Sequence, residues 1–185
     1  MMRIGGVVVM ILVGAALLAG AAEQMLQVVE SLDVERYMGK WYAIASIPTS
    51  FERQCIQGTT AEYTLLENGQ VQVVNTCYDA DGNPDVARGR AWIPDPKDPA
   101  KLQVSFVQFL WFWLFSAPYW VIDLPPDYSY AVVGHPTRQY GWILSRTPTL
   151  PEDVLSGIVT RLEEQGYRFE DFRIIDQSVH VVASD

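Results

Sequence analysis

TAEYTLLENGQVQVVNTC, residues 60–77, shows a pattern that recurs along most of the chain. It lies within two runs, 58–66 and 70–78, that are rich in valine, threonine and tyrosine, residue types that favour β-strands. Asn68 and Gly69 stand between the runs, and Asn-Gly flanked by such runs is a strong signal for a tight turn between antiparallel strands. The stretch therefore predicts a β-hairpin.

Similar short runs continue on both sides of this hairpin. Turn-forming segments such as DADGNPD, PDPKDPA and GHPTRQ separate them. The eight runs cover residues 40–47, 58–66, 70–78, 86–93, 101–108, 119–124, 128–134 and 139–146. Strands joined in this order form a barrel that leaves no free sheet edge and can hold one small ligand. The predicted fold is all-β, an eight-stranded antiparallel up-and-down barrel.

A helical pattern follows the last run. Thr149 and Glu152 have the spacing of a capping box, and Gly166 supplies a stop. The helix has one apolar stripe, so it is expected to pack against the outside of the barrel. The stripe consists of Val154, Leu155, Ile158, Val159 and Leu162. Residues 172–177 predict a short final strand, and the whole unit forms one domain over 32–177.

The first 21 residues have the order of a secretory signal peptide. Arg3 precedes an apolar stretch, and the small residues at 19–21 fit cleavage after Ala21. An uncleaved membrane anchor is the alternative, because the apolar stretch is just long enough to span a bilayer. A lipoprotein signal would need cysteine at the position of Ala21. The sequence therefore predicts an exported protein, periplasmic or secreted, without a lipid anchor.

The charge of the chain restricts its partners. The formal net charge is −9 and the sequence pI is about 4.6. Phosphates of nucleic acid or of anionic lipid would meet few basic side chains. We therefore expect no nucleic-acid partner and a ligand that is neutral or apolar.

Two cysteines, Cys55 and Cys77, bear on the compartment. Export implies oxidising conditions in which they can pair. In the predicted topology both lie at the open end of the barrel, so a bridge would fix a loop beside the mouth. The bridge would stabilise the fold by roughly 3 kcal/mol. Two buried free thiols are the alternative.

Residues 107–120, VQFLWFWLFSAPYW, form a nearly unbroken apolar run. The run is shorter than the roughly 20 residues of a membrane span and is broken by Ser116 and Pro118. In the barrel topology it spans the end of strand five, a loop at the open end and the start of strand six. Three interpretations follow: an apolar rim over a bound ligand, side chains that fill the barrel, or a wedge that makes transient contact with a membrane surface.

Two motifs resemble the signatures of the lipocalin family. DVERYMGKWYAIAS places Gly39 and Trp41 at the entry to the first strand, and WILSRTPTL places Arg146 at the end of the eighth. Both sites lie at one end of the barrel, where an arginine can stack on an indole ring. The middle family signature is present only loosely, in LPPDYSYAVVG. Within the family, FERQC, APYWVIDL and YGWILSRTPTL are most similar to the bacterial lipocalins and to apolipoprotein D.

Alternation and the resemblance together predict a ligand site. In KLQVSFV, residues 101–107, apolar and polar residues alternate, so the apolar set points inward. The resemblance implies that the tryptophan four residues before Arg146 also lies inside the barrel. Some aromatic side chains of the apolar run are expected to close over the outer end of the ligand, from the set Phe109, Trp111, Phe112, Trp113 and Trp120. The predicted ligand-binding residues are Leu102, Val104, Phe106, Trp111, Trp113, Trp120, Trp142 and Leu144.

The predicted function is a lipid-binding carrier, with a fatty acid or lysophospholipid as the ligand that the resemblance implies. His135 and His180, the two histidines, fit no catalytic triad or metal set. DADGNPD, which begins at Asp79, resembles the start of a calcium loop. The twelfth position of such a loop requires a bidentate carboxylate, and here that position is Arg90. We therefore expect no enzyme, cofactor or metal. Two alternatives are a lipocalin-fold enzyme acting on a lipid or isoprenoid, and a structural envelope protein with a filled barrel.

Overall fold

The computed structural model describes residues 25–181. The predicted signal peptide, residues 1–21, lies outside this range, so its cleavage after Ala21 remains a prediction. Within the described range, no helix is both long and apolar enough to cross a bilayer.

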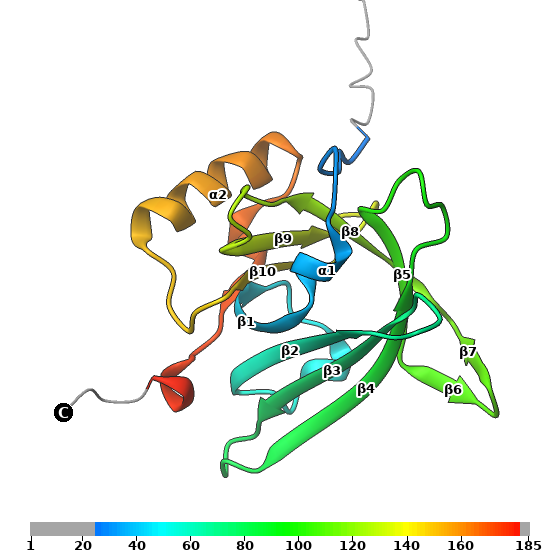
Figure 1. Cartoon of the computed structure of the whole chain (residues 1–185). Helices are drawn as coiled ribbons and strands as arrows, with labels where there is room; N and C mark the ends of the chain where they lie inside the picture. Colours follow the sequence, from blue (N-terminus) through cyan, green and yellow to red (C-terminus); the bar gives the residue numbers. More distant parts are fainter. Residues whose placement is uncertain (1–24, 182–185) are drawn as a thin grey trace, which may run out of the picture.

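Eight antiparallel strands close into a barrel (Figure 1). They are β1 (Gly39–Ser46), β2 (Gln57–Leu65), β3 (Val71–Tyr78), β4 (Pro84–Trp92), β5 (Lys101–Ser105), β8 (Ala117–Asp123), β9 (Tyr130–Gly134) and β10 (Gly141–Ser145). Each strand pairs with the next, and β10 returns to pair with β1. The predicted up-and-down barrel is confirmed.

The hairpin predicted from residues 60–77 is formed by β2 and β3. At its base, the backbone N–H of Leu66 donates to the carbonyl oxygen of Gln70 at 2.8 Å. Asn68 Oδ1 accepts a hydrogen bond from the backbone N–H of Gln70 at 3.1 Å. The Asn-Gly signal thus marks a three-residue loop, one of the common hairpin lengths.

The first part of the apolar run leaves the barrel, which corrects the predicted strand over 101–108, and residues 117–120 begin β8. β5 ends at Ser105, and β6 (Val107–Phe109) pairs with β7 (Phe112–Leu114) as a separate hairpin. The Ser105 hydroxyl bonds to the backbone oxygens of Val107 and Leu114. These bonds hold the base of the hairpin where the barrel pairing stops. In Figure 1 the β6–β7 hairpin points away from the barrel.

Two apolar clusters lie on opposite sides of the barrel wall. The inner cluster includes Trp41, Val73, Leu102 and Val133. The outer cluster lies between the wall and α2 (Glu152–Glu164) and includes Ile44, Ile122, Val132, Ile143, Ile158 and Leu162. The predicted packing of the helix on the outside of the barrel is confirmed (Figure 1).

The predicted capping box at the start of α2 is wrong. The N-cap residue is Pro151, without a side-chain capping bond, and the helix begins at Glu152. A residue that precedes proline disfavours the helical conformation, so Leu150 cannot extend the helix back to Thr149. The predicted stop is correct. Gly166 has φ +82° and, with the following residue, donates backbone hydrogen bonds to the last turn of the helix.

Short elements complete the fold. They are α1 (Val34–Tyr37), the 3-10 turns at Ser50–Glu52, Phe169–Asp171 and Ser178–His180, and β11 (Arg173–Ile174). β11 pairs with β1 outside the closed barrel, in the register Ala45 to Ile174. The final strand predicted over 172–177 is therefore present but shorter.

Candidate ligand-binding site in the barrel

Trp41 and Arg146 close one end of the barrel. Trp41 is completely buried, and its indole Nε1 donates to the backbone oxygen of Tyr37 at 2.9 Å. The Arg146 guanidinium carbon lies 3.6 Å from the centroid of the Trp41 ring. Its Nη1 and Nη2 donate to the backbone oxygens of Lys40 at 3.0 Å and Arg36 at 2.7 Å. The predicted stack is confirmed, and it joins α1 and β1 to the end of β10.

Gly39 lies beside this stack, and its backbone conformation favours glycine. Its φ of +92° lies in the left-handed region that residues with a side chain rarely adopt. A Cβ atom added there would lie 3.4 Å from Arg146 Nη1, an ordinary contact distance, so the two positions are neighbours. The Gly39, Trp41 and Arg146 positions therefore form one structural unit.

The apolar inner wall contains the residues predicted from alternation. Leu102 and Leu144 are buried in the inner cluster, and Val104 and Trp142 pack against it while remaining partly accessible. Phe106 follows the end of β5 and points inward, as Leu102 and Val104 do. Its ring covers Gly89, where an added Cβ would lie 2.7 Å from Phe106 Cδ1. These five residues line one continuous part of the barrel interior.

The inner wall is open to solvent toward the mouth. Ala91 belongs to the inner cluster, so Ala87, four residues earlier on β4, faces the same side of the sheet. Ala87 is nevertheless exposed, and Phe106 retains 41% of its accessible surface. Small residues also occupy other inward positions, namely Ala43, Ala61 and Ala131. The apolar inner surface is therefore accessible at the mouth, around Ala87 and Phe106.

Three tyrosines meet inside the barrel beside Trp41. The Tyr119 hydroxyl hydrogen-bonds with the Tyr37 hydroxyl at 2.8 Å and with the Tyr63 hydroxyl at 2.9 Å. The Tyr37 and Tyr63 rings stack with centroids 5.7 Å apart, and Tyr37 also contacts Trp41 at 5.1 Å between centroids. We call Tyr37, Tyr63 and Tyr119 the tyrosine floor.

Burial keeps the tyrosine floor uncharged. Desolvation raises the pKa of Tyr63 to about 12 and raises the pKa values of Tyr37 and Tyr119 well above the usual 10. Arg146 opposes this shift weakly at Tyr37 and Tyr63. At neutral pH the floor is therefore a set of neutral hydroxyl groups, each able to donate and to accept a hydrogen bond.

Three predicted rim tryptophans lie away from the inner wall, which corrects their expected positions. Trp120 packs against the outer cluster, with Lys101 Nζ 4.9 Å from its ring centroid. Trp113 lies over Arg90, whose guanidinium carbon is 5.6 Å from the ring centroid. Trp111 lies in the turn of the β6–β7 hairpin and is 74% exposed. These side chains do not close over the barrel because the run forms a hairpin of its own.

The β6–β7 hairpin is an exposed apolar surface. Its accessible residues are Val107, Phe109, Leu110, Trp111, Phe112, Leu114 and Phe115. No charged residue occurs in the segment 102–122. Exposed apolar patches of this kind mark interaction sites in soluble proteins. The hairpin part of the run therefore does not fill the barrel, whereas Tyr119, near the end of the run, lies inside it.

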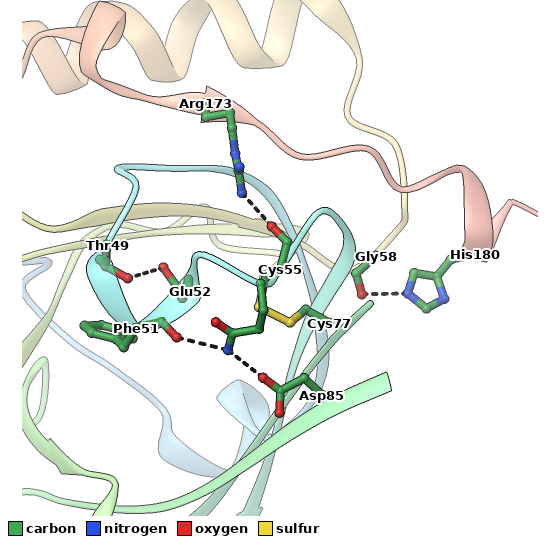
Figure 2. The surroundings of a disulfide bond; sticks show 10 residues. Thr49, Phe51, Glu52, Cys55, Gly58, Cys77, Asp85, Arg173 and His180 are labelled. Carbon is green, nitrogen blue, oxygen red and sulfur yellow. Dashed lines mark hydrogen bonds between the residues drawn. A yellow bond between two sulfur atoms is a disulfide. The ribbon is translucent and has the colours of Figure 1, made fainter. Parts of the chain in front are cut away.

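A disulfide between Cys55 and Cys77 ties the β1–β2 connection to β3 (Figure 2). Their Cα atoms are 5.4 Å apart. The carbonyl oxygen of Cys55 accepts a hydrogen bond from Arg173 at 3.1 Å, and Thr49 donates to Glu52 at 2.7 Å within the loop. The predicted bridge is confirmed, and it fixes a loop at the open end.

The histidines and the candidate metal ligands of the described range have structural partners. In the range 25–181 the one cluster with metal-ligand geometry is Cys55, Cys77 and Asp85, and the disulfide uses both of its sulfur atoms. His135 Nδ1 bonds to the hydroxyl of Thr137 in its own turn. His180 bonds to the backbone oxygen of Gly58 (Figure 2). His135 thus makes a contact within its own turn, and His180 joins the C-terminal segment to β2.

The tyrosine floor and Asn75 were not among the predicted site residues. Alternation in AEYTL could have placed Tyr63 on the inner wall beside Ala61. The inward position of Tyr119 follows only when Trp120 is known to face outward. Asn75 lies between the inward residues Val73 and Cys77 on β3, so alternation along this strand could have placed it on the inner wall.

Comparison with known proteins places this architecture in a family. A family model described as a lipocalin-like domain matches residues 32–177. The chain is 40% identical over 156 residues to temperature-induced lipocalin-1 of Arabidopsis thaliana, covering 83% of each chain. It is 40% identical over 158 residues to apolipoprotein D of Bos taurus, covering 80% of this chain and 78% of the relative. It is 36% identical over 151 residues to outer membrane lipoprotein Blc of Escherichia coli strain K12, covering 81% and 82%.

Solved structures share the same fold. Insecticyanin from the tobacco hornworm Manduca sexta matches with a TM-score of 0.64 at 23% identity, covering 82% of this chain and 84% of that chain. Lobster apocrustacyanin A1 matches with a TM-score of 0.59 at 22% identity, covering 77% and 78%. At these identities the likeness shows the fold alone.

Proposed function

Because the chain belongs to the lipocalin family, we propose that it is an exported carrier that holds one small hydrophobic molecule inside the barrel. The observation that carries this proposal is the accessible apolar inner wall above a closed end. Val104, Phe106 and Trp142 are partly accessible there, while Trp41 and Arg146 block the other end. A ligand would therefore enter at the mouth and bury its apolar part against this wall.

A fatty acid or a lysophospholipid is the proposed ligand. Burial of about fifteen methylene groups at about 0.8 kcal/mol each contributes roughly 12 kcal/mol. Association costs on the order of 4 kcal/mol or more. The remaining roughly 8 kcal/mol corresponds to about micromolar affinity, which suits a carrier that must also release its ligand.

Export to the periplasm or the exterior is supported by two features. The disulfide between Cys55 and Cys77 is typical of an oxidising compartment. Residues 1–21 have the pattern of a signal peptide, and Ala21 stands where a lipoprotein signal would need cysteine. We therefore propose an exported protein without a lipid anchor, unlike the relative whose name is outer membrane lipoprotein Blc.

The β6–β7 hairpin supports transient contact with a membrane as part of the same function. It exposes seven apolar residues, carries no charge and projects from the barrel (Figure 1). The net charge of −9 disfavours anionic lipid, so the proposed surface is one of neutral headgroups. Docking there would bring the barrel close to a source of ligand.

We propose carriage without catalysis. His135 and His180 make structural hydrogen bonds, and both cysteines of the metal-type cluster in the described range form a disulfide. A catalytic lipocalin would convert its lipid, whereas a carrier returns the lipid unchanged. A structural protein with a filled barrel would bind no lipid, and the accessible inner wall argues against that alternative.

Native mass spectrometry of the mature protein, purified from its own host, tests the proposal. We expect a mass excess that disappears on denaturation, and extraction should then recover an unmodified fatty acid or lysophospholipid. Incubation of the delipidated protein with that lipid should restore the mass excess without a new product. A protein without bound lipid that also fails to take up oleate would contradict the carrier function.

A further inference from the structure

The tyrosine floor contains one more hydrogen-bond donor than its own contacts can use. Three hydroxyl groups make two hydrogen bonds, with Tyr119 between Tyr37 and Tyr63. Each hydroxyl carries one proton, so three protons serve two bonds. Whichever way the bonds run, one proton finds no acceptor among the contacts of residues 25–181. A buried donor without a partner is unfavourable, so the floor is suited to an acceptor that a ligand supplies.

A spare acceptor lies on the same inner wall. Asn75 has an inward position on β3 and is opposite Ala61 in the register with β2. Tyr63 is two residues from Ala61, so Asn75 and Tyr63 are diagonal neighbours on one face of the sheet. The Asn75 Oδ1 atom is buried and has no hydrogen-bond partner in the described part of the chain. The wall near the floor thus offers both a donor and an acceptor, which together complement a hydroxyl group.

This part of the barrel suits an uncharged group. The three phenols are neutral at physiological pH because their burial disfavours ionisation. The nearby cation is Arg146, which is stacked on Trp41 and donates to the backbone oxygens of Lys40 and Arg36. A carboxylate at the floor would lose its hydration without gaining direct contact with this guanidinium group.

We propose that the tyrosine floor binds an uncharged oxygen, a hydroxyl group above all, on the end of the ligand that enters the barrel first. The proposal rests on the carrier function proposed for the same barrel. It narrows the ligand class to chains with a polar head at the mouth and an oxygen function at the inner end, such as ω-hydroxylated fatty acids. The apolar wall between mouth and floor contacts the methylene chain.

Matched ligand pairs test this inference. Isothermal titration calorimetry would compare palmitate with ω-hydroxypalmitate, and laurate with ω-hydroxylaurate, so that two chain lengths reach different depths. In at least one pair the wild-type protein should bind the hydroxylated acid as tightly as its parent or more tightly. An apolar floor would instead weaken binding of the hydroxylated acid by about tenfold or more, because the hydroxyl would be buried without a partner.

A variant that removes the donors gives the second arm. The triple substitution Tyr37→Phe, Tyr63→Phe and Tyr119→Phe keeps the rings and removes all three hydroxyls together, a replacement that costs little when both bonding partners are lost. It should weaken binding of the preferred hydroxylated acid about tenfold and change binding of its parent by less than about twofold. Tyr42→Phe is the control, because Tyr42 contacts His180, 5.3 Å away between ring centroids, outside the barrel.

The outcomes separate the inference from the function on which it rests. Wild-type protein that binds both parent acids but disfavours both hydroxylated acids overturns the inference and leaves the carrier function standing. Equal weakening of a parent acid and its hydroxylated counterpart by the triple variant would place the carboxylate at the floor and overturn it as well. Failure of all four acids to bind wild-type protein would contradict both proposals. The wild-type comparison remains decisive even if the triple variant does not fold.

Discussion

The guanidinium carbon of Arg146 lies 3.6 Å from the centre of the Trp41 ring, although 105 positions separate the two residues (146 − 41). The contact exists because β10 returns to pair with β1 and closes the barrel. It places a buried ring and a half-buried cation at the end opposite the mouth. The stack therefore depends on closure of the barrel.

Removal of either partner of this stack should destabilise the fold. Trp41→Ala should lower the free energy of unfolding by about 3 to 5 kcal/mol, because it deletes a large buried ring. Arg146→Ala should cost less, and the two effects should not add. Urea denaturation of both single variants and the double variant measures the coupling. A parallel cycle on Lys101 and Trp120, a more exposed pair 4.9 Å apart, is the control and should show weaker coupling. Additive effects at Trp41 and Arg146 would argue against the stack.

Reduction of the disulfide should loosen the open end. Loss of the Cys55–Cys77 bridge should lower the free energy of unfolding by roughly 3 kcal/mol, since the unfolded chain regains the entropy of an open loop. Urea midpoints with and without reductant measure this change, and reductant should not affect the Cys55→Ser/Cys77→Ser variant. Thiol labelling should require reduction. Two thiols that react in the untreated protein would refute the bridge.

The exposed hairpin should carry membrane adsorption. Trp111→Gln and Phe115→Gln should each weaken adsorption to neutral phosphatidylcholine vesicles by roughly tenfold, because each removes a ring that would leave water. Both residues are highly exposed, so unfolding free energies should change by less than about 0.5 kcal/mol. Ile174→Gln, on β11, is an exposed apolar control. Vesicle binding that survives both hairpin substitutions would remove the hairpin from the proposed docking surface.

Alkaline pH should destabilise the protein through the tyrosine floor. The folded pKa of Tyr63 is about 12, and those of Tyr37 and Tyr119 are also raised, whereas phenols of the unfolded chain titrate near 10. Above pH of about 10 the unfolded state therefore binds fewer protons than the folded state, and stability falls as pH rises. The floor contributes fully below that pH and loses its contribution as pH passes the folded pKa values.

Urea midpoints between about pH 8 and pH 11 would show this decline. The Tyr37→Phe/Tyr63→Phe/Tyr119→Phe variant should have a shallower decline than the wild type, because its floor does not titrate. A decline of equal slope in both proteins would assign the effect to other groups.

The sequence predicted the barrel because local signals agreed with the long-range fold. Turn residues marked the strand boundaries, and alternation in KLQVSFV correctly placed Leu102 and Val104 on the inner wall. The family resemblance placed Trp142 there as well. Such signals depend on residues that are neighbours in sequence, so they are readable without a structure.

Where both faces of a strand are covered, the sequence could not predict which side chains point into the barrel. Residues 119–122 are all apolar because Tyr119 and Val121 face the interior while Trp120 and Ile122 face the region beneath α2. Alternation of apolar and polar residues therefore could not show which of these side chains face the interior, and Trp120 was expected to lie inside. The tyrosine floor was missed for a related reason. Its three hydroxyls come from α1, β2 and β8, so their meeting depends on the closed barrel.

Trp142 and Trp120 provide the measurement that tests the carrier function most directly. Both are partly buried tryptophans of the same barrel, on β10 and β8, but Trp142 packs with the inner cluster and Trp120 with the outer one. Oleate titration of the delipidated protein would compare Trp142→Ala, Trp120→Ala and the wild type, with unfolding curves to show that each is folded. We predict about micromolar affinity for the wild type, an affinity about tenfold weaker for Trp142→Ala, and a change of less than about twofold for Trp120→Ala. Equal oleate affinity of folded Trp142→Ala and wild-type protein would contradict a ligand site inside the barrel.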